Sequence, residues 1–98
     1  MHVKITKHCH KRIFERAEIL EEKERTKLIR KIVEEGNIID IRGKNVLIKY
    51  DKHYLIIRLT SKGPVAISYT FKVIPKGFNQ RLTSGRKLKE LVKSRINN

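Results

Sequence analysis

Three side chains near the start of the sequence have the types and spacing that phosphodiester chemistry needs. His8, Arg12 and Arg16 are four residues apart, so on a helix they form one row. An imidazole exchanges protons near neutral pH, and guanidinium groups bind phosphate through paired hydrogen bonds and stabilise charge on its oxygens. The same spacing fits a plain basic helix face exposed to water, so both interpretations stay open.

The other histidines and the cysteine are weaker candidates for chemistry. His10 lies on a different helix face from His8, so we do not expect the two to act as a pair. His53 follows a turn at residues 51–52 and is expected at the surface. Cys9 falls in an apolar stripe, where burial as a small hydrophobic residue is expected. As the single cysteine of the chain it has no partner for an internal disulfide.

Carboxylates are few, since Asp and Glu number 10 against 24 Lys and Arg. No pair of them is spaced to hold two metal ions, and the sequence has no zinc motif or glycine-rich phosphate loop. We therefore expect no metal and no cofactor. A nuclease of this composition would use the RNA 2′-hydroxyl as nucleophile and leave a cyclic phosphate and a 5′-hydroxyl end.

The charge distribution points to a polyanionic partner. The net charge is +14 for 98 residues, which favours binding to RNA, DNA or an acidic protein. Residues 72–98 carry eight basic side chains and one acidic, more of one sign than solubility requires. The residues expected to bind RNA are Lys49, Arg58, Lys72, Arg86, Lys87, Lys89 and Lys93.

Neither a membrane nor an oxidising compartment is indicated. No apolar run approaches the ~20 residues that span a bilayer, and the first residues lack the pattern of a signal peptide. We expect a cytoplasmic protein, acting either in its own cell or in the cytoplasm of a target cell.

The hydrophobic periodicity predicts the elements that position these side chains. A first helix capped by Thr6 runs to about Ala17, and a second spans 21–35 and ends at Gly36. The expected stripe of the first helix contains Ile5, Cys9, Ile13, Ala17 and Leu20. Four strands over 38–42, 46–50, 54–60 and 65–73 follow, joined by short turns, and a helix over 84–95 comes last.

This order of elements predicts an α+β domain. Residues 1–75 form two N-terminal helices packed on a four-stranded antiparallel meander sheet. Residues 76–98 form a basic, mostly helical C-terminal extension packed on the same domain. Within the last strand, alternation predicts that one face is shared by Val65, Ile67, Tyr69 and Phe71.

Over about residues 3–75 the chain resembles a known group of proteins. The opening Ile5-Thr6-Lys7-His8, with Arg12 and Arg16 following and a second helix ending near Gly36-Asn37-Ile38-Ile39, is similar to small bacterial proteins with a His-x3-Arg-x3-Arg first helix. These belong to the barnase–EndoU–colicin–RelE-like superfamily, in which two helices pack on a four-stranded antiparallel sheet. Many members are ribonuclease toxins held by an antitoxin or immunity protein.

The resemblance implies roles for four residues. His8 would transfer protons, Arg12 and Arg16 would bind phosphate, and the hydroxyl of Thr70 would contact the RNA. The chain departs from the group in two places. Its second strand turn, residues 51–52, lacks the usual glycine, and residues 76–98 fall outside the match.

Three functions are compatible with these observations. The preferred one is a metal-independent endoribonuclease toxin that cleaves tRNA or mRNA and is neutralised by an acidic antitoxin or immunity protein. The second is a non-catalytic nucleic-acid-binding module with a regulatory or accessory role. The third is an interaction domain for an acidic protein. The sequence leaves the second acid or base open: a tyrosine, a lysine or His10 could supply it.

Overall fold

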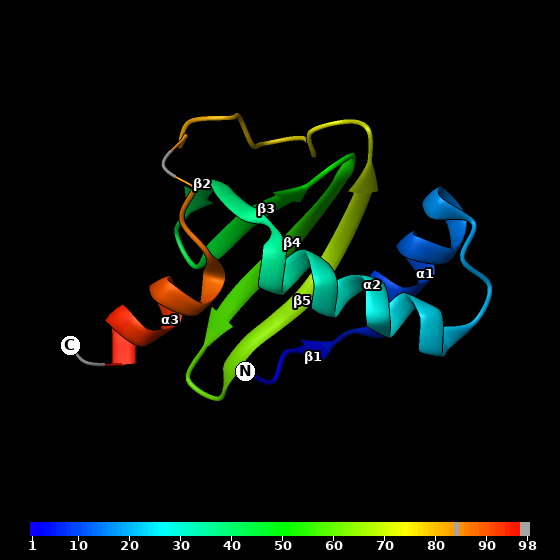
Figure 1. The fold of residues 1–98 in the computed structure, drawn as a ribbon, viewed down its shortest axis with the longest axis horizontal. Helices are drawn as coiled ribbons and strands as arrows, with labels where there is room; N and C mark the ends of the chain where they lie inside the picture. Colours follow the sequence, from blue (N-terminus) through cyan, green and yellow to red (C-terminus); the bar gives the residue numbers. More distant parts are fainter. Residues whose placement is uncertain (84, 97–98) are drawn as a thin grey trace.

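The structure is a computed structural model that describes residues 1–83 and 85–96. The three helices are α1 (Lys7–Ala17), α2 (Glu22–Glu35) and α3 (Leu88–Ile96). The strands are β1 (Lys4–Ile5), β2 (Asn37–Arg42), β3 (Asn45–Tyr50), β4 (His53–Thr60) and β5 (Gly63–Phe71). Figure 1 shows α1 and α2 on one face of the sheet and α3 at the far end from α1. None of the helices within the described ranges is long and apolar enough to cross a membrane.

The sheet has five strands in the order β1-β5-β4-β3-β2. The α+β class and the antiparallel meander β2–β5 are confirmed, but the predicted four-stranded, purely antiparallel sheet is wrong. Strand β1 pairs in parallel with β5, with Lys4 opposite Val65 and Ile5 opposite Ala66. The chain entering α1 runs along the edge of the long strand β5, so Ile5 belongs to β1 and not to the stripe of α1.

Helix α1 begins where the sequence predicted, because Thr6 caps it. The Thr6 hydroxyl accepts a hydrogen bond from the Cys9 amide at 3.1 Å and donates one to the Ala66 carbonyl at 3.2 Å. Caps of this kind stabilise a helix by about 1 kcal/mol, and this one also fixes α1 to β5. The helix ends at Glu18, whose φ of 56° is left-handed. Leu20 is therefore outside the helix and 72% exposed, contrary to the predicted stripe.

A bulge in β5 changes which side chains of that strand share a face. Ile56 and Ile57 of β4 pair with Ser68 and Ala66, so Ile67 is an extra residue. Beyond a bulge the alternation of a strand is inverted, which places Ala66 and Tyr69 together on the helix side, both fully buried. The prediction that one face of the strand is shared by Val65, Ile67, Tyr69 and Phe71 is therefore wrong.

Both faces of the sheet are covered in part. The main core lies between the sheet and the helices and includes Cys9, Ile13, Ile29 and Ile32. On the opposite face, called the outer face below, a smaller cluster is formed by Ile39, Leu47, Tyr54, Ile56, Ile74 and Phe78. The last two come from the segment after β5, which Figure 1 shows crossing the end of the sheet toward β2.

Gly36 ends α2 as predicted, although for a different reason. Its φ of −74° is open to any residue. A Cβ there would collide with the Ile32 carbonyl and lie 2.6 Å from the Ile48 Cγ2 atom. Glycine is needed because the end of α2 approaches β3 closely, and its left-handed freedom is not used.

The chain after β5 is bonded along β2 before α3 begins. The amides of Arg81 and Leu82 donate to the Ile39 carbonyl at 2.8 and 2.9 Å, and the Ile38 amide donates to the Arg86 carbonyl at 2.7 Å. This extended path delays the last helix, which starts at Leu88. Ser84, where it was predicted to start, lies outside the described residues. Leu88, fully buried, and Leu91 complete the core.

Asp40, the one buried charged side chain among the described residues, fastens this segment. Its carboxylate accepts hydrogen bonds from the Asn79 amide at 2.9 Å, the Ile41 amide at 2.9 Å and the Arg42 Nε at 3.0 Å. Burial alone would raise the pKa of Asp40, but these bonds and the Arg42 charge outweigh it and lower the pKa. The ionised carboxylate therefore ties β2 to the segment after β5.

Candidate functional site

The row of His8, Arg12 and Arg16 lies along an unpaired stretch of the sheet edge. Helix α1 packs on β5, and β1 pairs with β5 only at Val65 and Ala66. From Ile67 onward, no described strand covers this edge of β5. The Arg16 Nη1 donates to the Tyr69 carbonyl at 2.7 Å, so the end of the row reaches the strand backbone.

His8 and Arg12 are neighbours on the helix, as their spacing predicted, and they are also directly bonded. The Arg12 Nε donates to the His8 Nε2 at 3.3 Å, and its Nη1 donates to Glu15 Oε1 at 3.2 Å. With Nε2 as the acceptor, the neutral ring carries its proton on Nδ1. His8 is exposed and the Arg12 side chain is 34% exposed. The three groups lie on one helix surface, and among the described residues no hydrogen bond joins them to another element.

Thr70 is placed elsewhere. It pairs with Tyr54 of β4 on the outer face, and its hydroxyl donates to the Val73 carbonyl at 2.6 Å. The structure therefore does not bring Thr70 to His8. The row on α1 instead contacts Tyr69, the residue before Thr70, whose carbonyl accepts a hydrogen bond from Arg16.

Lys49 and Arg58, predicted to bind RNA, come from the central strands and project on the outer face. The Lys49 Nζ lies 5.6 Å from the Tyr54 ring centroid, and the Arg58 Nε donates to Asn45 Oδ1 at 3.3 Å. Lys49, Tyr54 and Thr70 are paired in succession across β3, β4 and β5. The charges are thus not at a sheet edge, the commoner place for a cation in an apolar strand.

The C-terminal cations are divided between different tasks. The Lys87 Nζ donates to the Glu35 carbonyl at 2.6 Å and to Asn37 Oδ1 at 2.8 Å, so it closes the end of α2. Arg86 is half-buried, whereas Lys89 and Lys93 are exposed on α3. Lys72 directly follows β5, with its Nζ 5.1 Å from the Phe71 ring centroid.

A histidine treated as a surface residue turns out to be half-buried and bonded. The His53 Nδ1 lies 2.6 Å from the Tyr69 hydroxyl. Burial lowers the pKa of His53, and the nearby Asp51 charge opposes this. Burial raises the pKa of Tyr69 to about 12. The sequence signal was the two-residue turn, which makes Tyr50 and His53 direct partners across the hairpin.

A second histidine–arginine pair lies on the other side of α1. The Arg25 Nε donates to His10 Nδ1 at 3.1 Å. The same guanidinium donates to the carbonyls of Ile19 and Leu20 at 3.0 and 2.6 Å. His10 therefore belongs to the junction between α1 and α2, which leaves it poorly placed to assist His8.

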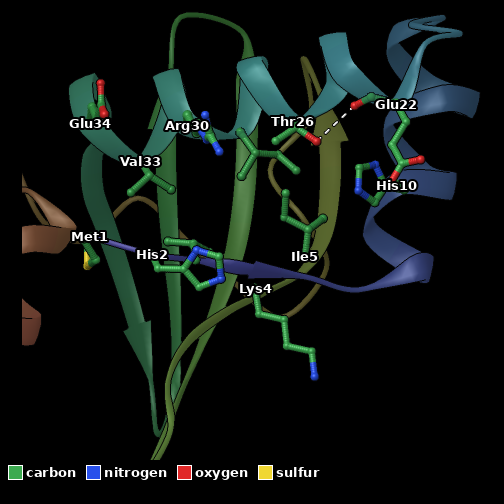
Figure 2. Close-up of a pocket in the computed structure, with 12 residues that line it drawn as sticks. Met1, His2, Lys4, Ile5, His10, Glu22, Thr26, Arg30, Val33 and Glu34 are labelled. Atoms are coloured by element: carbon green, nitrogen blue, oxygen red, sulfur yellow. Dashed lines mark hydrogen bonds between the residues drawn. The ribbon is translucent and has the colours of Figure 1, made fainter.

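A groove of about 600 Å³ lies between β1 and α2. Figure 2 shows His10 and Glu22 at one end and Glu34 near the other, with Thr26 bonded to the Glu22 carbonyl. Its charged lining mixes Lys4 and Arg30 with carboxylates. This mixture suits a polyanion less well than the row on α1. Elsewhere, within residues 1–83 and 85–96, no three His, Cys, Asp or Glu side chains are grouped to hold a metal ion.

Comparison of the chain with protein-family models, with curated proteins and with solved structures finds no match.

Proposed function

We propose that the protein is a metal-independent endoribonuclease that acts on tRNA or mRNA in the cytoplasm. The observation that carries the proposal is the bond between the Arg12 Nε and the His8 Nε2 at 3.3 Å. It places an imidazole and a guanidinium within reach of one phosphate group, on an open surface, with Arg16 one helical turn further along. Four residues of helix rise ~6 Å, so Arg16 is positioned for the next phosphate of an extended strand.

RNA binding would rearrange the pair before it could act. In the free protein Arg12 occupies the lone pair of His8 Nε2. A phosphate forms stronger, charge-assisted bonds with a guanidinium than a neutral imidazole does, so it draws Arg12 away and frees Nε2. Glu15 does not prevent this, because exposed pairs of this kind contribute only about 0–1 kcal/mol.

The freed imidazole then supplies the base. His8 Nε2 takes the proton of the 2′-hydroxyl, and the 2′-oxygen attacks phosphorus as the bond to the 5′-oxygen breaks. The leaving 5′-oxygen takes a proton from water or a second side chain. Arg12 stabilises the charge that develops on the phosphoryl oxygens. The products are a 2′,3′-cyclic phosphate and a 5′-hydroxyl end.

The remaining cations would hold the RNA around this centre. Lys49 and Arg58 on the outer face and Lys72 at the end of β5 extend the positive surface away from α1. Binding through such contacts weakens steeply with salt. The resemblance to ribonuclease toxins implies an acidic antitoxin or immunity protein as partner, and charge complementarity would guide its docking over the row on α1.

The experiment that tests the proposal is cleavage of total RNA by purified protein in excess chelator. Wild type should give discrete fragments that end in cyclic phosphate. His8→Ala should lower the rate by at least about 100-fold, in line with the loss of a proton-transfer group, and still shift RNA on a gel. His10→Ala is the matched control on the same helix and should still cleave.

A second function is favoured by one observation, the solvent exposure of His8. An exposed basic helix face also suits a non-catalytic nucleic-acid-binding module. Intact RNA that is shifted equally by wild type and His8→Ala would contradict catalysis and support that module. Substitution of Lys89 and Lys93 by alanine would then lower both the affinity and its salt dependence.

A further inference from the structure

Three ring-bearing side chains form a cross-strand row at the end of the sheet on the helix side. Tyr50 pairs with His53, and His53 pairs with Phe71. The Tyr50 and His53 rings are nearly parallel, at 9°, with centroids 6.4 Å apart, and the Phe71 centroid is 5.4 Å from that of His53. All three residues are half-buried, so each is partly accessible to solvent.

The His53 imidazole is the polar group among these rings, and one of its two nitrogens is held by a hydrogen bond. The Tyr69 hydroxyl, at 2.6 Å from His53 Nδ1, fixes the ring plane. No described residue forms a hydrogen bond with His53 Nε2. A purely structural end of the core would not need a histidine in the middle of two aromatic residues, because an apolar ring would fill the space without a polar atom to satisfy.

Positive charge flanks the rings on two sides. The Lys72 Nζ lies 5.1 Å from the Phe71 centroid, where a left-handed φ of 66° turns the chain. The Arg16 guanidinium is bonded to the carbonyl of Tyr69, the residue whose hydroxyl holds His53. The three rings therefore lie next to Arg16, the last residue of the proposed phosphate-binding row on α1. Asp51, at the hairpin turn, is the acidic residue near His53.

We propose that Tyr50, His53 and Phe71 form a binding site for an unpaired nucleobase of single-stranded RNA. The inference rests on the proposed action on RNA and adds a subsite to it. The base stacks on the exposed ring surface, His53 Nε2 bonds to its polar edge, and Arg16 and Lys72 hold the adjoining phosphates. Flat rings beside cations are the combination with which proteins bind single strands, because every base has a π-face.

The site implies a preference for single-stranded regions. A base in a duplex is stacked and paired and cannot reach the row without being displaced. RNA held by Arg16 would therefore be selected at loops and ends, where a base is free to enter. The row on α1 alone, which contacts only the backbone, gives no such selection.

The test compares two short 2′-O-methyl RNA oligonucleotides, which cannot be cleaved through a 2′-hydroxyl. One carries all its bases and the other has abasic positions in its centre. Binding of a labelled strand at low salt is measured by fluorescence anisotropy for wild type, Tyr50→Leu and Tyr50→Phe. Phe14→Leu is the matched control, because Phe14 is also aromatic and 47% exposed but lies on α1 outside the row.

Tyr50→Leu should weaken binding of the base-bearing strand by about five-fold or more, the effect of losing one base–aromatic stack. It should leave binding of the abasic strand unaffected, because Arg16 and Lys72, which hold the phosphates, are unchanged. Tyr50→Phe should restore binding, since it keeps the ring, and Phe14→Leu should match wild type with both strands. As a check that needs no variant, the aromatic proton resonances of wild-type Tyr50 should shift with the base-bearing strand only.

Equal affinity of wild type for the two strands would overturn the site, as would Tyr50→Leu behaving like wild type or failure of the base-bearing strand to bind. These outcomes are separable from failure of the ribonuclease proposal. Cleavage that depends on His8 together with base-independent binding would remove the base site alone. Base-dependent binding without cleavage would keep the site and assign it to a non-catalytic module.

Discussion

The two sides of α1 carry the same pair of residues in different surroundings. On one side the Arg12 Nε donates to His8, and on the other the Arg25 Nε donates to His10, at 3.3 and 3.1 Å. Arg25 also binds two backbone carbonyls in the junction between α1 and α2. Apart from His8, the hydrogen-bond partner of Arg12 among the described residues is Glu15, one helical turn away on the same exposed surface.

The comparison shows that a histidine–arginine bond does not define a role by itself. The Arg25 pair is fixed because three acceptors from two segments hold one guanidinium, and breaking it leaves carbonyls without their donor. The Arg12 pair is free to rearrange because, among the described residues, its hydrogen bonds stay within its own helix. We therefore assign stability to the first pair and chemistry to the second, and four experiments test this division.

The largest effect is expected from Arg12→Ala. Loss of a donor to the developing phosphoryl charge should reduce RNA cleavage on the order of 100-fold. The free energy of unfolding should change by less than about 0.5 kcal/mol, since the bonds lost are exposed. Single-turnover cleavage and urea denaturation measure the two quantities. A large loss of stability would show that the Arg12 pair is structural after all.

Arg25→Ala should show the opposite pattern. Removing a charged donor from two loop carbonyls and His10 should lower the free energy of unfolding by about 2 kcal/mol. Cleavage measured well below the melting temperature should remain close to wild type. Arg25→Lys is the control that keeps the charge but not the forked geometry, and it should recover only part of the stability. Unchanged stability in Arg25→Ala would contradict the structural role.

Cys9 lies between His8 and His10 in the sequence, and its reactivity tests which of the two arginine pairs stabilises α1. It is fully buried, and burial raises the pKa of its thiol to about 12, so alkylation requires α1 to open. At neutral pH, Cys9 in Arg25→Ala should be alkylated roughly 10-fold or more faster than in wild type, because that variant has lost stability. Cys9 in Arg12→Ala should react at the wild-type rate. Equal rates in all three proteins would show that α1 does not depend on Arg25.

The smallest effect concerns the charge of the row. Arg16→Gln should lower the slope of log affinity against log salt by about 1, because one phosphate contact is lost. Arg25→Gln carries the same charge change and should leave the slope unaltered. RNA binding titrated over a range of salt concentrations gives both slopes. A similar loss in the two variants would mean that net charge, and not the row, determines binding.

Local signals in the sequence predicted much of the fold. The Thr6 cap, the helical spacing that makes His8 and Arg12 neighbours and the burial of Cys9 depend on residues within one or two turns, and all three are confirmed. The meander was predicted because short turns join runs of apolar residues. Such features need no knowledge of distant segments.

The rest depends on segments far apart in the chain. A two-residue strand such as β1 has no period and exists only because β5 lies beside it. The bulge at Ile67 is visible only in the pairing with β4. Likewise the partner of His10 is fifteen residues away and that of His53 sixteen. Which histidine is open and which is fixed could not be predicted for this reason.

The bonds that hold residues 81–86 against β2 have a consequence for the protein in bulk solution. They occupy the backbone groups of Ile38 and Ile39 through which a second molecule could add a strand. On the opposite edge the guanidinium of Arg16 covers the Tyr69 carbonyl. The edge at β2 is thus shielded from edge-to-edge polymerisation, and the edge at β5 is blocked at Tyr69. Releasing residues 81–86 from β2 would uncover these groups and should favour association of two molecules through their β2 edges.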